Sequence, residues 1–368
     1  MTPTRSGIAT VVACMLAGPA TSADWPVFRG SPEMSGVSPN KVPEKLDEKW
    51  KFKTGNAIEG APAVVGGVVY VASSDKHLYA IDLKTGQEKW KAKIGAPTKA
   101  SPGVKGDRVY LGDADGKFYC FDVANGRQSW VVEAGGEINS GCNFFKDKIL
   151  VGSYDGSLTC LAADGKKDWE FKLDQPVNGS PAVAGNRTFV AGCDSVVHII
   201  DAENGKEVGS VDIGGQAGAT AAVSGDDVYV GTMANQVVGI NWKAPKKLWS
   251  FEAPRRQQPF YASAAVTDSL VIAGSRDKKV YGLDRTTGKE TWSFITDGQV
   301  ECSPAVAGGR VYVGCQSADG YFYVLDLKTG AKIQELNLDG AVTGSPAIGP
   351  DCVLIGTEKG TLFCLGTK

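Results

Sequence analysis

The sequence predicts an all-β protein, an eight-bladed β-propeller of four-stranded antiparallel blades. The first observation is a period of about 40 residues, marked by tryptophans at Trp50, Trp90, Trp130, Trp169, Trp249 and Trp292. Gly209 stands where the one double-length step lacks a tryptophan, and a copy near Gln334 completes eight units. The second observation is the glycine content, 47 of 368 residues, which indicates many tight turns. A fixed period of about 20–50 residues with short alternating segments is typical of propeller blades.

Each unit predicts four short strands, called A to D in chain order. In the first unit, strand A covers 61–65, strand B 68–73 and strand C 77–82, and strand D carries Trp90. Two glycines separate strands A and B, as expected of a type II′ hairpin, which has glycine first. No helical period longer than a turn or two occurs, so helical repeats of similar length are excluded.

The strand count predicts how the ring closes. Eight A–B–C triples are followed by only seven D strands, because the chain ends after the last strand C. The segment Glu48–Lys53 precedes the first strand A, and we expect it to become strand D of the last blade, so that no open edge remains. We expect removal of residues 24–42 alone to be mild. The chain thus divides into a signal peptide, an N-terminal extension and the propeller: 1–23, 24–45 and 46–368.

The first residues predict export. Arg5 gives a positive start, 7–17 is a short stretch of apolar and small residues, and 21–23 places small residues at a cleavage site. The apolar run is shorter than the about 20 residues of a spanning helix. We therefore expect a periplasmic or secreted protein. The run ending at Cys14 resembles a lipobox and leaves a lipid anchor on Cys14 open as an alternative.

The composition excludes several function classes. A formal net charge of -2 argues against a basic, phosphate-seeking surface, so no nucleic-acid partner is expected. The chain has only two histidines, His77 and His198, and neither has a Cys or His partner at ligand spacing. This excludes most histidine-based hydrolases and zinc sites, and we expect both histidines to be ordinary strand C residues. No catalytic residue and no metal site is predicted.

The units resemble the repeat of pyrroloquinoline quinone (PQQ) propellers, Ala-x-Asp-x-x-Thr-Gly-x-x-x-Trp. The motif is complete from Ala80 to Trp90, with near copies at 120–130, 282–292 and 326–330. The family contains quinoprotein dehydrogenases, which are longer, and BamB-like proteins, which are exported, non-enzymatic scaffolds of outer-membrane protein assembly. The start of the extension, 24–30, is similar to that of bacterial exported propellers of unassigned function.

The motif residues have structural roles that explain their spacing. Asp82 and Thr85 can hydrogen-bond the backbone of their own turn, and Gly86 can take a positive φ. The tryptophan ring can fill the wedge between neighbouring blades. The repeat therefore identifies the fold and leaves the function open.

One position per unit, two residues before the centre of strand A, is expected to circle a mouth of the central channel. These positions are Glu59, Lys99, Asn139, Asn178, Gly218, Tyr261, Glu301 and Thr343. Glu59 and Glu301 lie on the first and seventh blades, with one blade between them, and could share a cation such as calcium, or the solvated mouth could simply be polar. Quinoprotein dehydrogenases resemble one another in an adjacent cysteine pair, and this chain has none. No cofactor is predicted, and PQQ with calcium is expected only if the chain is a dehydrogenase.

The cysteines predict packing positions and one disulfide. Cys120, Cys160 and Cys364 occupy the small buried position of strand C. Counting back from the turn at Gly308-Gly309 places Cys302 opposite Cys315 on strands A and B, close enough to bridge in an exported protein.

Two insertions break the repeat on the face where the D–A and B–C loops lie. They cover 253–261 before the sixth blade and 316–320 in the seventh. Arginine beside aromatic residues is typical of interface anchors, and a spacer loop is the alternative. The predicted partner-binding residues are Arg255, Arg256, Phe260, Tyr261, Gln316 and Asp319. As surface positions, Arg255 and Phe260 are expected to tolerate alanine.

The leading hypothesis is an exported, BamB-like propeller that binds another protein or a cell-envelope component and performs no chemistry. A PQQ-dependent dehydrogenase or cofactor-binding propeller, and a polysaccharide-binding module, are the alternatives. We expect a monomer that is at most peripheral to a membrane.

Overall fold

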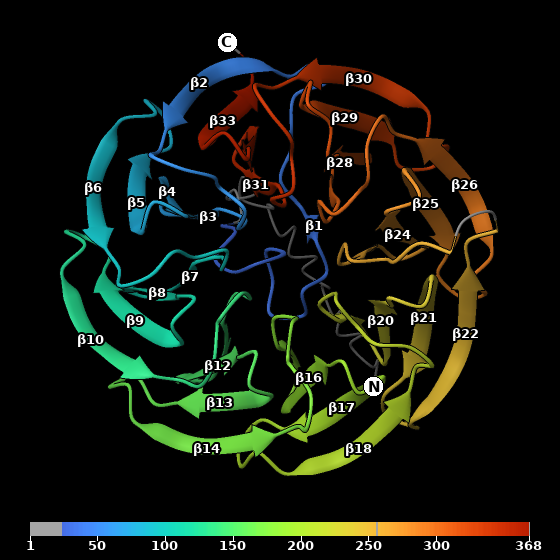
Figure 1. Ribbon diagram of the computed structural model, residues 1–368. Helices are drawn as coiled ribbons and strands as arrows, with labels where there is room; N and C mark the ends of the chain where they lie inside the picture. Colours follow the sequence, from blue (N-terminus) through green and yellow to red (C-terminus); the bar gives the residue numbers. More distant parts are fainter. Residues whose placement is uncertain (1–23, 255–256, 368) are drawn as a thin grey trace, which may run out of the picture.

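The computed structural model describes residues 24–254 and 257–367, and these form eight sheets around a central axis, each with four antiparallel strands (Figure 1). The predicted all-β, eight-bladed propeller is confirmed. Strand A of each blade is innermost and strand D outermost. In the described part of the chain, no helix is long and apolar enough to span a membrane. The predicted signal peptide and Cys14, together with Arg255 and Arg256, lie outside the described residues.

The strands follow the blades in chain order. Blades one to three contain β3 (Ala63–Val65), β4 (Val68–Ser73), β5 (His77–Asp82) and β6 (Glu88–Lys93), then β7 (Gly103–Lys105), β8 (Arg108–Gly112), β9 (Lys117–Asp122) and β10 (Gln128–Glu133), then β11 (Asn143–Phe145), β12 (Lys148–Gly152), β13 (Ser157–Leu161) and β14 (Lys167–Lys172). Blades four to six contain β15 (Ala182–Ala184), β16 (Arg187–Ala191), β17 (Val196–Asp201) and β18 (Glu207–Asp212), then β19 (Ala222–Ser224), β20 (Asp227–Gly231), β21 (Gln236–Asn241) and β22 (Lys246–Glu252), then β23 (Ala265–Val266), β24 (Leu270–Ser275), β25 (Lys279–Asp284) and β26 (Glu290–Ile295). Blade seven contains β27 (Ala305–Ala307), β28 (Arg310–Gly314), β29 (Tyr321–Asp326) and β30 (Lys332–Asn337), and blade eight contains β31 (Ala347–Gly349), β32 (Cys352–Gly356), β33 (Thr361–Gly366) and β2 (Asp47–Lys53).

The ring closes at blade eight as the strand count predicts. Strand β2 pairs antiparallel with β33, with Trp50 opposite Cys364 and Lys53 opposite Thr361. The first and last strands of the propeller are therefore neighbours in one sheet (Figure 1).

The motif tryptophans join neighbouring blades. Nε1 of Trp90 donates to the carbonyl of Val123 at 2.9 Å, and its ring lies against Gly126 of the next blade. A Cβ at Gly126 would lie 2.5 Å from that ring, which is why glycine is needed there. Five further rings lie in the same way against the glycine of the next turn: Trp50 on Gly86, Trp130 on Gly165, Trp169 on Gly205, Trp249 on Gly288 and Trp292 on Gly330.

The predicted turn chemistry is also present. Oδ1 of Asp82 accepts from the backbone N–H of Thr85 at 2.8 Å and from its hydroxyl at 2.9 Å. Gly86 follows at φ 71°. The same aspartate–threonine pair recurs in the turns at Asp284 and Asp326.

The N-terminal extension runs through the centre of the ring (Figure 1). Its strand β1 (Val37–Ser38) pairs parallel with β27. Carbonyls of the extension accept backbone N–H groups from strand A of six blades: Val64, Val104, Val183, Val223, Val266 and Val306. Nδ2 of Asn143 donates from the third blade to the carbonyl of Pro32 at 2.7 Å, and Nδ2 of Asn40 donates to Ile348 of the eighth at 3.5 Å. The extension therefore contacts every blade and plugs the channel.

The position of the N-terminal extension, called the plug from here on, corrects the expectation that removal of residues 24–42 would be mild. Trp25, Val27 and Met34 are each at most 1% exposed, so the extension belongs to the core. Its removal would expose these side chains and leave strand A donors of six blades without acceptors, which is not a mild change.

Candidate functional site

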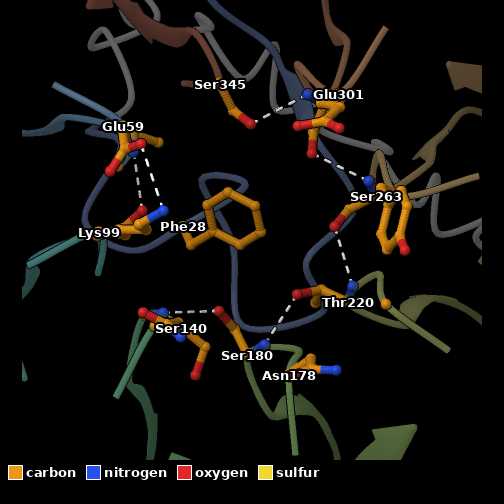
Figure 2. Close-up of a pocket in the computed structure, with 18 residues that line it drawn as sticks. Phe28, Glu59, Lys99, Ser140, Asn178, Ser180, Thr220, Ser263, Glu301 and Ser345 are labelled. Carbon is orange, nitrogen blue, oxygen red and sulfur yellow. Dashed lines mark hydrogen bonds and ion pairs between the residues drawn. The ribbon is translucent and has the colours of Figure 1, made fainter. Parts of the chain in front are cut away.

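A cup opens at the channel mouth on the face where the D–A and B–C loops lie, here called the loop face (Figure 2). The cup has a volume of about 160 Å³, and Phe28 of the plug lies at its centre. Seven of the eight ring positions predicted from the sequence line it: Glu59, Lys99, Asn139, Asn178, Gly218, Tyr261 and Glu301. Thr343 is not among the residues that line the cup. The repeat thus brings together side chains that are far apart in the sequence.

The seven ring residues that line the cup are here called the rim. Below the rim lies a belt of hydroxyl groups that the sequence analysis missed. A backbone N–H of one blade donates to a serine or threonine oxygen of the next at 2.8–3.1 Å (Figure 2). The donor–acceptor pairs are Ala61–Ser101, Gly141–Ser180, Ser180–Thr220, Thr220–Ser263, Ser263–Ser303 and Ser303–Ser345. The signal was available, since a hydroxyl residue recurs two positions before strand A in most units.

The two rim carboxylates are separately neutralised. Glu59 lies 3.4 Å from Nζ of Lys99. Glu301 is paired with Arg276, whose Nε donates to Oε1 at 2.5 Å, and it also accepts from Nε2 of Gln316 at 3.0 Å. No group of three His, Cys, Asp or Glu residues that could hold a metal ion occurs within residues 24–254 and 257–367. The pairing gives Glu59 and Glu301 other partners than the shared cation considered from the sequence.

The inserted loops meet at one side of the rim. Arg276 stacks over the ring of Tyr261, with Cζ 4.1 Å from the ring centroid, and the Tyr261 ring lies against Gly218. Together with Glu301 and Gln316, these two side chains form what we call the mouth patch. Arg276 was missed in the sequence, although an arginine here replaces the serine found at Ser74 in the first unit.

The predicted partner-binding residues differ in how exposed they are in the structure. Tyr261 and Gln316 are half-buried in the mouth patch, and Asp319 is exposed on the loop of the seventh blade. Phe260 is 0% exposed and packs against Phe251 and Tyr281, so its prediction as a surface anchor is wrong. The reason is that the insertion folds back and uses its aromatic residue to fill the space beside blade six.

The cysteine pair does not form the predicted bridge. Cys302 and Cys315 are both free and buried. Strand β27 begins only at Ala305, so Cys302 lies before the paired region, and its Sγ accepts from the N–H of Gly314 at 3.2 Å. Burial raises the pKa of the Cys302 thiol to about 12. Cys120, Cys160 and Cys364 are buried on strand C as predicted.

Both histidines lie on strand C, as expected from the sequence. His77 is on β5 and His198 on β17. The ring nitrogens of His198 contact Asp194 and Glu207, each at 2.7 Å. These contacts explain His198 as part of a surface network on the fourth blade.

The chain matches the profile of the family described as outer membrane protein assembly factor BamB, over residues 47–144, 135–252 and 193–368. No curated protein sequence matches it. Among solved structures it is similar to BamB from Moraxella catarrhalis, with 19% identity over 88% of this chain and 98% of that chain and a TM-score of 0.76. A europium-containing methanol dehydrogenase matches with 14% identity over 95% of this chain and 99% of that chain and a TM-score of 0.77. A quinohemoprotein alcohol dehydrogenase from Pseudomonas putida HK5 matches with 13% identity over 94% of this chain and 80% of that chain and a TM-score of 0.75. At these identities the solved structures share the fold alone.

Proposed function

Because the chain belongs to the family of the outer membrane protein assembly factor BamB, we propose that it is an exported, non-enzymatic propeller that binds another protein of the cell envelope. The observation that carries this proposal is the mouth patch, where the repeat is broken by two inserted loops on neighbouring blades. A partner can distinguish this region from the other, nearly uniform blades.

The mouth patch has the composition and rigidity of a protein-binding surface. Tyrosine and arginine are enriched among the residues that dominate binding energy. Arg276 is held by both Tyr261 and Glu301, so little side-chain freedom remains to be lost when a partner binds. Asp319 adds an exposed charge on the adjacent loop. A partner that covers this side of the rim would also reach the cup.

A dehydrogenase is the weaker candidate. If PQQ with calcium were bound in the cup, Glu59 and Glu301 would be the carboxylates available to the metal, and each already pairs with its own cation. The cup volume of about 160 Å³ is also below the about 300–1,000 Å³ of pockets that enclose drug-sized ligands. The side chains present therefore do not fit this cofactor.

The proposal includes export to the periplasm or beyond, as the N-terminal sequence predicts, with lipidation of Cys14 as an alternative mode of attachment. We propose a monomer that associates at most peripherally with a membrane and does not bind nucleic acid.

The test places a photo-crosslinking amino acid at Asp319 in cells that express the full chain. Lys84, exposed in the turn at the opposite face, is the matched control position. We expect partner adducts from position 319 and none from position 84. Recovery of the identified partner should fall about thirtyfold or more in the Tyr261→Ala/Arg276→Ala variant, since loss of central anchors costs about 2 kcal/mol or more.

Two results would overturn the proposal. One is equal partner recovery by the wild type and the folded double variant. The other is dye-linked alcohol oxidation by the pure protein loaded with PQQ and calcium.

A further inference from the structure

The cup contains hydroxyl protons that have no acceptor among the described residues. Each belt oxygen already accepts a backbone N–H, so its own O–H remains to donate. Six such hydroxyls, on Ser101, Ser180, Thr220, Ser263, Ser303 and Ser345, line the cup and are each at most 6% exposed. The belt therefore offers donors to any oxygen-rich group in the cup.

A seventh hydroxyl supports a ligand more directly. Ser140 lines the cup at 7% exposure, and its buried Oγ has no hydrogen-bond partner. A buried polar group without a partner costs about 1–3 kcal/mol, so such groups are uncommon and call for an explanation. A molecule that enters the cup and reaches Ser140 would supply the missing partner.

The rim provides both acceptors and donors. The Asn139 side chain has no hydrogen-bond partner among the described residues, and Asn178 uses only its Nδ2, which donates to Sγ of Cys193 at 3.2 Å. Oδ1 of Asn178 is left to accept. An amide group beside carboxylates and hydroxyls can bind a ligand whose groups both donate and accept.

The charges on the rim of the cup cancel, and the buried guanidinium of Arg29 is already bonded to the carbonyls of Ser303, Ala264 and Pro304. Glu59 and Glu301 are balanced by Lys99 and Arg276, so the rim carries two charges of each sign and no net charge. An anion such as phosphate or a polycarboxylate would gain no net attraction and would face two carboxylates. The cup therefore favours a neutral ligand.

The floor of the cup is aromatic. Phe28 lies at its centre, with hydroxyl and amide side chains around it (Figure 2). A small ring with C–H groups on one face and hydroxyls at its edge would place the apolar face on Phe28 and direct the hydroxyls to the belt and rim. The volume of about 160 Å³ suits one such ring.

We propose that the cup binds one neutral sugar ring, either free or at the end of a glycan, with its face on Phe28 and its hydroxyls bonded to the belt, Asn139 and Asn178. This site lies beside the mouth patch and does not depend on the protein partner. The loop face then has two functions, sugar binding in the cup and partner binding at the mouth patch.

The purified full-length mature protein is titrated with D-glucose, D-galactose, D-mannose and N-acetyl-D-glucosamine up to about 10 mM. Binding of each sugar is measured by calorimetry and by saturation-transfer NMR. We expect one-to-one binding of at least one sugar, with saturation transferred most strongly to C–H protons of one ring face. The Asn139→Ala/Asn178→Ala variant should bind about tenfold more weakly or worse, because each lost hydrogen bond leaves a sugar hydroxyl unpaired. Asn186→Ala, an asparagine on the opposite face, is the matched control and should bind as the wild type does.

Several outcomes would overturn the inference. These are no binding of any of the four sugars, binding that the asparagine double variant leaves unchanged, and citrate or sulfate binding to the cup more tightly than every sugar. Thermal unfolding of each variant without ligand shows whether it is folded. If no sugar binds to the cup, the expected partner crosslinking from position 319 is unchanged, so the two proposals are tested separately.

Discussion

Arg29 of the plug donates a hydrogen bond from Nη1 to the carbonyl of Ser303 at 3.0 Å, although 274 residues separate the two in the chain. Its Nη2 donates to the carbonyls of Ala264, at 3.2 Å, and Pro304. Arg29 is 1% exposed, and burial lowers its pKa to about 9, so it stays charged at neutral pH. One buried cation therefore ties the extension to blades six and seven.

We expect Arg29→Ala to lower the free energy of unfolding by about 2–3 kcal/mol, because it leaves buried carbonyls without donors, and this outweighs the relief of the desolvation cost. Urea denaturation measures the change. Arg127, exposed in the turn of blade two, is the control, and Arg127→Ala should change stability by no more than about 0.5 kcal/mol. Equal stability of the two variants would show that the plug is not anchored through Arg29.

The plug and the rim show which features the sequence could predict. Glu59 and Glu301 were placed at one channel mouth because every unit begins strand A at the same point of the period, so one aligned position gives the whole ring. The plug has no period, and its binding depends on strand A N–H groups of six blades, together with the side chains of Asn143 and Asn40 at the other two. Nothing in the Trp25–Arg29 segment itself indicates that it occupies the axis. The side chain of Phe260 was misplaced for a related reason, since an inserted loop can fold inward without any change in its own pattern.

The hydroxyl belt predicts a pair of opposite effects. Ser303→Ala removes the acceptor for the N–H of Ser263 and should lower the free energy of unfolding by about 1–3 kcal/mol. Ala61 stands at the equivalent position of blade one, where the N–H of Ser345 meets no hydroxyl. Ala61→Ser should therefore fill this gap in the belt, which has a second gap at Gly141 of blade three, and raise stability by about 0.5–1.5 kcal/mol, as measured by chemical denaturation. A destabilising Ala61→Ser would contradict the repeat geometry.

The turn aspartates predict sensitivity to acid. Hydrogen bonds from Thr85, Thr287 and Thr329 hold the pKa of Asp82, Asp284 and Asp326 below the ordinary value. Because the pKa is lower in the folded state than the about 3.9 of an unfolded chain, this stabilisation is present above about pH 4 and is lost as the pH falls through the folded values.

The variant Thr85→Val/Thr287→Val/Thr329→Val tests this dependence. It should melt at a lower temperature than the wild type at pH 7, and the difference should shrink as the pH is lowered towards 2. Thermal unfolding followed by circular dichroism gives both values. If the difference in melting temperature between wild type and variant stayed constant from pH 7 to pH 2, the threonines would stabilise the fold independently of the ionised aspartates, which would contradict the prediction.

Phe260 and Tyr261 are adjacent in the insertion but should respond differently to substitution. Phe260 is 0% exposed, with its ring centroid 5.8 Å from that of Tyr281, so Phe260→Ala should cost about 3–5 kcal/mol in chemical denaturation. Tyr261 is half-buried at the rim, and Tyr261→Ala should cost about 1 kcal/mol. Loss of partner recovery in Phe260→Ala would then reflect unfolding, whereas the same loss in Tyr261→Ala would reflect the interface. If Phe260→Ala proved as stable as Tyr261→Ala, the packing of the insertion against blade six would be contradicted.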